Sequence, residues 1–273
     1  ARKLIPTKQR VRTLNQLKDN FRKIYDTLHG VFLVHELSPR TMDYIISFGE
    51  RCSTFIIAEH LKSKKIPAHF IDARLLVKTD DNFGEAKVDM NLTRKNIRIS
   101  LGKLKGVKVV TGFIGSTSND ETTTLGRGGS DYTAAIFGAA LKAKEIEIWT
   151  DVDGVMTADP RKVKKAFSIP SLTYEEAMEM SHFGAKIIYP PTIQPAYERR
   201  IPLRIKNTFN LEFSGTVIHR KRSPNDFPVR GISSIDDIAM LSLQGSGMVG
   251  VAGISARLFG ALASVKINVM LIT

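Results

Sequence analysis

The sequence contains a single cysteine, Cys52, among 273 residues, so no disulfide can form within the chain. A near absence of cysteine fits a reducing compartment. No apolar run approaches the roughly 20 residues that span a bilayer, and no hydrophobic signal segment follows the basic start Ala1-Arg2-Lys3. We therefore expect a cytoplasmic protein with no membrane partner.

Acidic residues are scarce relative to basic ones, and the chain has a formal net charge of +13. Residues 1–30 alone contain eight Lys and Arg against two Asp and Glu. The sequence shows no zinc-finger, single-stranded-RNA or basic-zipper signature to accompany this charge, so we expect no nucleic-acid partner. A solvated basic helix face and anionic small substrates both remain as explanations.

Two helical stretches are predicted near the start of the chain. Apolar residues recur every three or four positions from Val11 to Leu28, which indicates an amphipathic helix. Ser38-Pro39 is typical of a helix cap followed by the first helical residue. We expect the next helix to break at Phe48-Gly49 and to resume from Glu50 to about Leu61.

Short apolar runs then alternate with helical patterns. The predicted strands are Ala68 to Ile71, Val107 to Val110, Glu145 to Trp149 and Leu203 to Ile205. The predicted helices are Asp131 to Lys142, Tyr174 to Ser181 and Ile193 to Arg199, and Thr173 with Glu176 has the spacing of a capping box. This alternation favours an α/β fold in which helices sandwich one mostly parallel sheet. Such sheets bind ligands in the loops at the carboxyl ends of their strands.

A polar stretch that contains proline, residues 220–226, predicts a domain boundary. We divide the chain into a first domain at 1–222, a linker at 223–232 and a C-terminal piece at 233–273. The last piece predicts one β-α-β unit, with strands at Ile238 to Leu243 and Ile267 to Ile272 and a helix at Gly253 to Ala263. Two strands bury a sheet face poorly, so we expect the chain to end inside a domain.

The segment Thr122–Asp131 carries the strongest functional pattern. Its three glycines permit left-handed backbone and close approach of a ligand, and the helix that follows offers free N–H groups. Arg127 adds a planar fork suited to a carboxylate or a phosphate. The segment therefore predicts an anion site, although Ser130 and Asp131 could serve only as the helix cap and a first-turn acid. It is not a Walker A loop, because no Gly-Lys-Ser/Thr follows.

Three further segments have both a functional and a structural interpretation. Trp149–Val155, with Arg161 downstream, follows a predicted strand; its acids could contact a nucleotide or serve as turn residues, and the calcium spacing of an EF-hand is absent. Glu50 at the expected helix break could pair with an ammonium group or be a first-turn acid. Lys186 could meet a nucleotide phosphate or lie on the surface. We expect no metal ligands from the protein.

In their order along the chain, these segments resemble the aspartate kinases of the amino-acid kinase superfamily. The matching motifs are Gly49-Glu50-Arg51-Cys52-Ser53, Gly112-Phe113-Ile114-Gly115, Thr122 through Ala135, Trp149 through Gly154, Thr157-Ala158-Asp159-Pro160-Arg161 and Phe183-Gly184-Ala185-Lys186. Residues 239–272 resemble the first half of tandem ACT domains that sense lysine or threonine. The whole is similar to bifunctional enzymes that fuse aspartate kinase to homoserine dehydrogenase.

The resemblance implies a site made from two groups of residues. In the first, Glu50 holds the α-ammonium of L-aspartate, Arg127 grips a carboxylate and Asp131 orients the active-site lysine, so that Arg127 and Asp131 act in catalysis. The remaining substrate residues implied are Phe113, Ile114, Gly115, Gly128, Gly129 and Ser130. The residues implied to contact ATP are Thr150, Asp151, Asp153, Met156, Arg161 and Lys186. Mg²⁺ is expected to be held by ATP phosphates and water.

The resemblance further implies feedback by threonine or lysine and a homo-oligomer formed through ACT domains. The family opens with a strand and a Lys-Phe-Gly-Gly loop that supplies a phosphate-stabilising lysine, and this chain begins downstream of that loop. We therefore expect these 273 residues alone to be catalytically inert. Two alternatives stay open: another carboxylate kinase of the same superfamily, and a non-catalytic module that binds ligands and dimerises.

Overall fold

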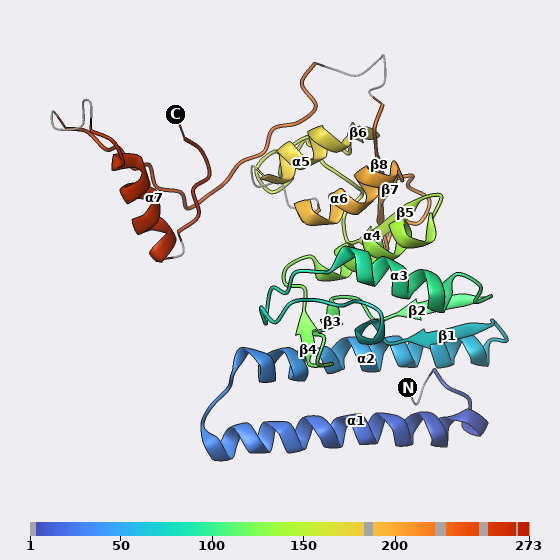
Figure 1. Ribbon diagram of the computed structural model, residues 1–273. Helices are drawn as coiled ribbons and strands as arrows, with labels where there is room; N and C mark the ends of the chain where they lie inside the picture. Colours follow the sequence, from blue (N-terminus) through green and yellow to red (C-terminus); the bar gives the residue numbers. More distant parts are fainter. Residues whose placement is uncertain (1–3, 183–187, 222–227, 246–250, 266, 273) are drawn as a thin grey trace.

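The computed structural model describes residues 4–182, 188–221, 228–245, 251–265 and 267–272. Figure 1 shows a layered body, made by residues 4–221, and a C-terminal region around a single helix to one side of it. We call these two parts the body and the tail. The body buries the hydrophobic cores of the chain, and its layers determine where the predicted site residues lie.

Two long antiparallel helices form the bottom layer of the body in Figure 1. Helix α1 spans Thr7–Val34 and helix α2 spans Pro39–Ser63. Ser38 caps α2 as expected, since its hydroxyl accepts a hydrogen bond from the Thr41 N–H at 3.2 Å. The expected break at Phe48-Gly49 is wrong, because α2 runs through it without interruption. One glycine costs a helix only about 1 kcal/mol, and Phe48 beside it is buried.

The layers above α2 come from the first half of the chain. Strand β1 (Ala68–Ile71) pairs in parallel with β2 (Val107–Val110), and β3 (Ile114–Ser116) pairs with β4 (Thr122–Thr124) as an antiparallel hairpin. The 3₁₀ turn η1 (Ala73–Leu75) follows β1, helix α3 spans Met90–Leu101 and helix α4 spans Gly129–Leu141. Ile97, Ile114 and Ile136 are fully buried where these elements meet.

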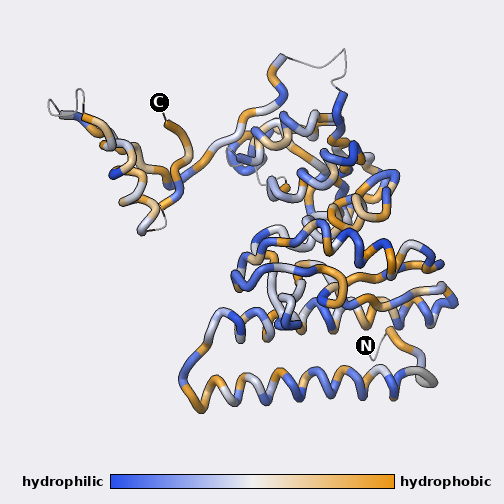
Figure 2. Tube along the Cα trace, in the orientation of Figure 1, coloured by the Kyte–Doolittle hydropathy of each residue, from blue (hydrophilic) through white to orange (hydrophobic). Residues whose placement is uncertain are grey.

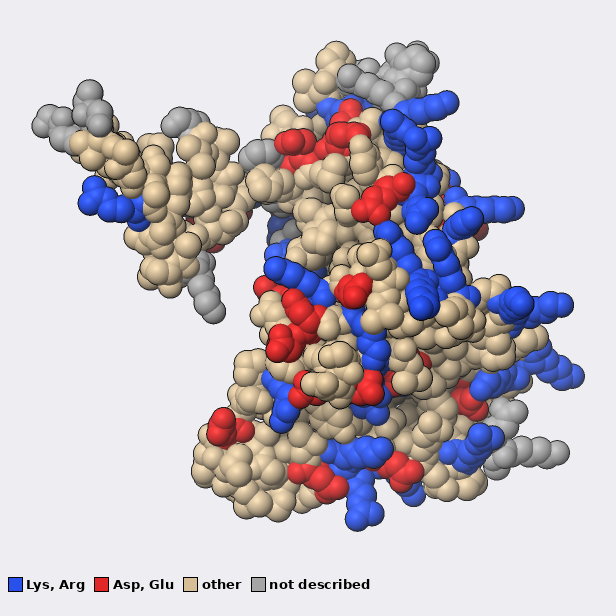
Figure 3. Space-filling model, in the orientation of Figure 1, with Lys and Arg blue, Asp and Glu red and all other residues tan. Residues whose placement is uncertain are grey.

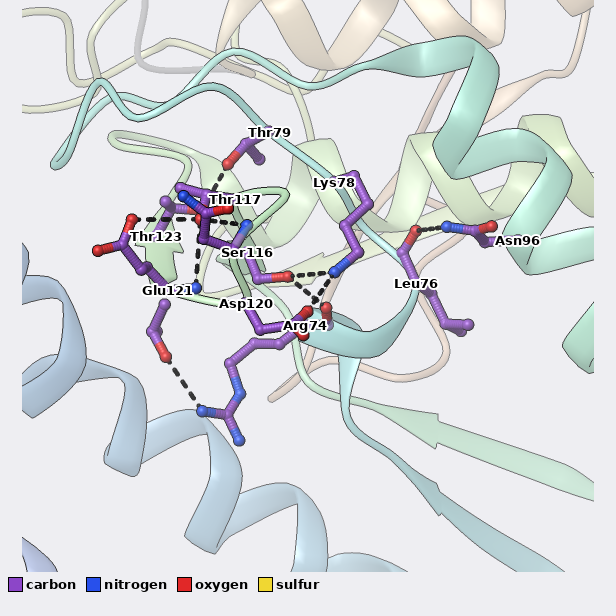
Figure 4. Close-up of polar contacts among 12 residues, drawn as sticks. Arg74, Leu76, Lys78, Thr79, Asn96, Ser116, Thr117, Asp120, Glu121 and Thr123 are labelled. Carbon is purple, nitrogen blue, oxygen red and sulfur yellow. Dashed lines mark hydrogen bonds and ion pairs between the residues drawn. The ribbon is translucent and has the colours of Figure 1, made fainter.

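A polar network fixes the β3–β4 hairpin to its surroundings (Figure 4). Lys78 donates from Nζ to Ser116 Oγ at 2.9 Å and to Asp120 Oδ1 at 2.7 Å. At the tip of the hairpin, Arg40 of α2 donates to Glu121 Oε1 at 2.8 Å. The hairpin leads directly into residues 125–128, so this network also holds the start of the glycine-rich turn.

The second half of the chain forms the upper part of the body. Its strands are β5 (Ile146–Thr150), β6 (Ser171–Thr173), β7 (Leu203–Asn207) and β8 (Thr216–His219), in the order β5-β7-β8-β6. Helices α5 (Tyr174–His182) and α6 (Pro190–Arg199) pack with them. The predicted capping box is confirmed: the Thr173 N–H donates to Glu176 Oε2, and the Glu176 N–H donates to Thr173 Oγ1.

The α/β fold class is confirmed, and most strand pairs are parallel, namely β1–β2, β5–β7 and β6–β8. Within the described residues the strands form three sheets. Two antiparallel pairs, β3–β4 and β7–β8, interrupt the parallel arrangement. The β7–β8 reversal depends on Gly215, which has φ of +74° and lies so close to Ile205 O that a side chain would collide with it.

The tail differs from its prediction. Its helix, α7 (Ile254–Ser264), forms where expected. The strands expected at Ile238 to Leu243 and Ile267 to Ile272 are not formed, because no neighbouring strand lies alongside either stretch within the described residues to pair with its backbone. Their apolar side chains stay exposed, with Met240 94% and Leu241 65% accessible. Figure 2 shows this region as largely hydrophobic despite its exposure.

Charge is unevenly spread over the face drawn in Figure 3, where Lys and Arg gather along one side of the body. Part of this basic surface forms a pocket of about 380 Å³ between α3 and α6, lined by Asn91, Arg94, Lys95, Arg98, Ile99 and Arg199. None of these residues is a predicted site residue. No helix in the described ranges is long and apolar enough to cross a membrane.

Candidate active site

The turn before α4 leaves the start of that helix open to a ligand. Gly128 is the N-cap, with φ of +67°, and no side chain caps the helix. The first helical hydrogen bond is donated by the Tyr132 N–H to Gly128 O. In the described part of the chain, no acceptor takes the N–H groups of Ser130 and Asp131. The interpretation of Ser130 as the cap is therefore wrong, and two free N–H groups point to an anion site.

Phe113 lies directly against this helix start. Its backbone has φ of +69°, a left-handed conformation that is costly for a bulky residue. Two hydrogen bonds hold it, one from the Phe113 N–H to Thr133 Oγ1 at 3.0 Å and one from the Leu125 N–H to Phe113 O at 2.8 Å. A Cβ at Gly129 would lie 2.8 Å from the Phe113 ring. Strain held in place by its surroundings is common at functional sites.

The structure brings Gly112 into the same cluster. A Cβ at Gly112 would lie 3.0 Å from Ser130 Oγ, so only glycine permits this contact without a shift of the helix. Ile114 and Gly115, predicted to line the substrate pocket, lie in β3 instead. Ile114 is fully buried in the core, and Gly115 packs against Val77 O. These two residues pack in the core beside the site, and their contact with a substrate stays a prediction.

Two charged side chains stand at the helix start without a partner among the described residues. Arg127 is exposed and makes no ion pair there. Asp131 is half-buried, and this burial raises the pKa of its carboxyl above the ordinary value. A half-buried carboxylate without a cation costs stability. The arrangement suits a ligand or a further chain segment that brings a positive charge to Asp131.

Glu50 belongs to the middle of α2, where it is partly buried. It follows Asp43 by two helical turns, so both residues face the same side of the helix, roughly 10 Å apart along its axis. That side contacts β4, the strand that precedes the glycine-rich turn. The position is compatible with the predicted contact to a substrate, but none of the described hydrogen bonds joins the Glu50 side chain to the α4 cluster.

Asp43 itself was missed by the sequence analysis. Its carboxylate is 1% exposed and accepts three hydrogen bonds, from the Gly84 N–H and the Thr124 N–H at 2.9 Å and from Thr124 Oγ1 at 2.8 Å. Asp43 thus holds α2, β4 and the turn at Gly84 together. In the folded protein Asp43 lies on the face of α2 that also carries Ser47, Thr54 and Ala58, all of them buried.

The second predicted group lies after β5, at the carboxyl end of a parallel strand as expected. Thr150 ends this strand, and its hydroxyl donates to Asp151 Oδ1 at 3.2 Å. Asp153 Oδ1 accepts hydrogen bonds from Asn207 at 2.9 Å and from Asn210 at 3.1 Å, so its carboxylate is fixed from β7. Asp151 is exposed and remains available to a ligand.

The loop beyond Asp153 carries the last two predicted nucleotide residues within the described ranges. Met156 forms an isolated bridge with Ser168. The Arg161 guanidinium donates two side-chain hydrogen bonds to the carboxylate of Asp159 and lowers the pKa of Asp159 to about 2. Its side chain is 76% exposed, which leaves the outer edge of the guanidinium free for an anion. Lys186 lies outside the described residues.

Helix α4, which begins at the first group, packs against β5 and α6. Helix α4 covers β5 at Gly138, where a Cβ would lie 2.6 Å from Ile146. Tyr189, which precedes α6, lies against Gly128 so closely that a Cβ there would be 2.4 Å from Tyr189 Cβ. Within the described residues, no cluster of three or more His, Cys, Asp or Glu could hold a metal ion. A metal ion bound here would take most of its ligands from elsewhere.

Comparison with known proteins shows which family the chain belongs to. The profile described as "Amino acid kinase family" matches residues 8–207, which include both groups of predicted residues up to the end of β7. The chain belongs to the amino acid kinase family. A second profile, for an ACT domain, matches residues 241–273 and coincides with most of the tail.

Members of this family resembling the chain are aspartokinases. The chain is 38% identical over 259 residues to the bifunctional aspartokinase/homoserine dehydrogenase of Buchnera aphidicola, covering 94% of this chain and 32% of that protein. It is 37% identical over 247 residues to aspartokinase 1 of Arabidopsis thaliana, covering 89% of this chain and 43% of that protein. The chain thus spans well under half the length of both relatives.

A solved structure agrees in fold over most of the chain. The crystal structure of E. coli aspartokinase III in complex with aspartate and ADP, in the R-state, superimposes with a TM-score of 0.80 at 33% identity. The match covers 95% of this chain and 58% of that one. The same enzyme with lysine and aspartate, in the T-state, gives a TM-score of 0.77 at 34% identity.

Proposed function

We propose that the complete protein is an aspartate kinase, which transfers the γ-phosphate of ATP to the β-carboxylate of L-aspartate. The observation that carries this proposal is the open start of α4, where two N–H groups have no acceptor among the described residues and where Arg127 precedes the cap and a strained Phe113 packs against Gly129. The relatives named above are aspartokinases, and one was crystallised with aspartate and ADP. The proposal extends that activity to the protein that contains this chain.

The reaction needs positive charge more than it needs a base. The β-carboxylate of aspartate, with an ordinary pKa of about 3.9, is already ionised at neutral pH. Its approach to a phosphate brings two anions together, which costs about 4 kcal/mol for unit charges ~4 Å apart at an effective dielectric constant of 20. Fixed N–H dipoles and cations offset this repulsion and hold the reacting groups in line.

We assign the substrate and the nucleotide to the two groups described above. Arg127 and the N–H groups of Ser130 and Asp131 bind the carboxylates of aspartate, with Glu50 as the partner of its ammonium group. Thr150, Asp151, Asp153, Met156, Arg161 and Lys186 are assigned to ATP. Mg²⁺ bound to the ATP phosphates supplies charge neutralisation there.

The test of this assignment is the substitution Arg127→Ala in the complete protein. Product is measured as aspartyl hydroxamate while aspartate and ATP are varied in turn. We expect kcat/KM for aspartate to fall about 10²–10³-fold while KM for ATP changes less than about threefold. Arg199→Ala, at an exposed arginine in the basic pocket between α3 and α6, is the matched control and should leave both constants unchanged. Equal losses for both substrates would reject Arg127 as an aspartate residue.

We also propose that the boundaries at 1–222, 223–232 and 233–273 separate catalytic, linking and regulatory parts. The ranges of the two family profiles support this division. The regulatory part is proposed to sense threonine or lysine and to join subunits, as lysine is bound in the T-state relative. Inhibition assays with each amino acid test the first point, and sedimentation of the complete protein with and without residues from 233 onward tests the second.

A further inference from the structure

Residues 228–236, which we call the strap, lie across the loop that carries Arg161. The Ile232 N–H donates to Thr157 O at 2.8 Å, at the start of that loop. Lys162 Nζ donates to Asp236 Oδ1 at 2.6 Å and to Ser234 Oγ at 3.1 Å, directly after Arg161. The strap therefore contacts the loop on both sides of the exposed guanidinium.

The strap is also fixed to the body upstream of these contacts. Arg230 donates to the backbone oxygen of Ser171 in β6, and its Nε lies 3.8 Å from Glu176 Oε2 in α5. Gly231 passes so near Met180 that a Cβ would lie 2.7 Å from its terminal methyl. These contacts give the strap a rigid base, since β6 and α5 belong to the buried core.

The strap does not pack flush against the loop. A pocket of about 520 Å³ lies between them, and its lining includes Thr157, Phe167, Ile169, Pro228 and Val229. Because this space separates the two segments, the strap contacts the loop mainly through the polar contacts of Ile232 and Lys162. Figure 1 shows that the same segment continues directly to the tail and α7.

Apart from its contacts with the strap, the described hydrogen bonds of the loop stay within residues 157–167. Its base is closed by the Thr157 N–H, which donates to Phe167 O, and by the Phe167 N–H, which donates to Thr157 Oγ1. Nearer the tip, the N–H groups of Lys162 and Val163 donate to Asp159 O, and Arg161 pairs with Asp159. We propose that the strap positions Arg161 for nucleotide binding, with Ile232 and Asp236 as positioning residues. This inference rests on the proposed function, in which Arg161 contacts ATP. The strap thereby connects the nucleotide loop to the tail.

The first test compares two substitutions at Ile232 in the complete protein. Ile232→Pro removes the N–H donor, whereas Ile232→Ala keeps it and loses only a side chain that is 71% exposed. We expect Ile232→Pro to raise KM for ATP and Kd for ADP by about 2–10-fold and to leave KM for aspartate unchanged. Ile232→Ala should match the wild type in all three constants.

A second pair of variants tests the same idea without altering the backbone. Asp236→Lys places two cations together and should raise KM for ATP by about 2–5-fold. The double variant Lys162→Asp/Asp236→Lys restores an opposite-charge pair and should return KM to the wild-type value. Thermal unfolding of each variant shows whether it is folded, and if Ile232→Pro does not fold, this charge series decides the question.

Three results would overturn the inference: identical constants for Ile232→Pro and Ile232→Ala, equal rises in KM for ATP and aspartate, or no rescue by the charge swap. Failure of the proposed function gives a different result, namely a wild-type protein that forms no aspartyl hydroxamate. In that case calorimetric titration of ADP into the same variants still decides whether the strap positions the nucleotide loop.

Discussion

Helices α4 and α7 begin with the same local structure, but α4 is packed against other helices and α7 is exposed. Each follows a glycine in the left-handed conformation, Gly128 or Gly253, and neither has a side-chain cap. Helix α4 packs between α3 and α6 and buries most of its apolar residues. None of the residues of α7 is buried, and a Cβ at Gly253 would meet nothing within 4 Å.

The difference shows what local sequence does and what neighbours do. Local signals suffice to start and stop both helices, because alanine and leucine favour helix and glycine permits the turn. Burial of an apolar face depends on a partner surface, and only the body supplies one within the described residues. A candidate site can be built at the start of α4 because α4 is held on both sides. The same local motif at α7 holds nothing in place.

The largest expected effect compares one leucine in the body with one in the tail. Leu203→Ala removes a side chain that is fully buried in β7 and should lower the free energy of unfolding by about 2–5 kcal/mol. Leu241→Ala, at a residue 65% exposed, should change it by less than about 0.5 kcal/mol. Urea unfolding followed by circular dichroism measures both. A destabilisation above about 1 kcal/mol at Leu241 would show that the tail packs in solution.

A smaller effect is expected for polar contacts in the two regions. Asp43→Ala leaves the Gly84 and Thr124 donors without their buried acceptor and should cost about 1–3 kcal/mol. The matched change in the tail is Gln244→Ala, which removes an exposed hydrogen bond to Ser242 and should be neutral. Thermal unfolding at neutral pH gives both values. Equal effects of the two substitutions would contradict the view that only the body is tightly packed.

The smallest effect concerns the charge at the candidate site. Burial raises the pKa of Asp131 in the folded protein, so folding favours the protonated carboxyl, and this stability is lost as pH rises through the folded pKa. Asp131→Asn should therefore raise the free energy of unfolding at pH 7 by roughly 0.5 kcal/mol, which is measured as a higher unfolding temperature. At pH values below the ordinary pKa of aspartate, the variant and the wild type should not differ. If the difference in unfolding temperature between Asp131→Asn and the wild type is the same at every pH, this prediction is contradicted.

Short apolar runs predicted four strands of the body, namely β1, β2, β5 and β7. Strands β1 and β2 begin and end where expected, because each is a compact apolar run followed by a turn. The break at Gly49 was wrong because packing of Phe48 outweighs the small cost of one glycine. The tail strands were wrong because a strand requires a partner that sequence periodicity does not report. No strand was predicted at β3, β4, β6 or β8, since such short strands carry little pattern.

Part of the candidate site was likewise predicted from the sequence, and part of it was not. The glycine-rich turn and the end of β5 were predicted from their residues, because a free helix start and the carboxyl end of a strand have recognisable sequences. The roles of Phe113 and Asp43 were not derivable from pattern alone. One depends on a backbone conformation imposed by Thr133 and Leu125, and the other on hydrogen bonds to segments some 40 and 80 residues away.

The contact between Phe113 and Gly129 has a consequence for how this protein can change during evolution. The ring occupies the space that any side chain at position 129 would need, since a Cβ there would lie 2.8 Å from Phe113 Cδ2. Position 129 can therefore accept a side chain only if the ring at position 113 is lost, and Leu125 Cβ at 3.1 Å crowds the same space. We expect the residues at positions 113 and 129 to covary among related sequences, because a substitution at one position limits which residues the other can accept.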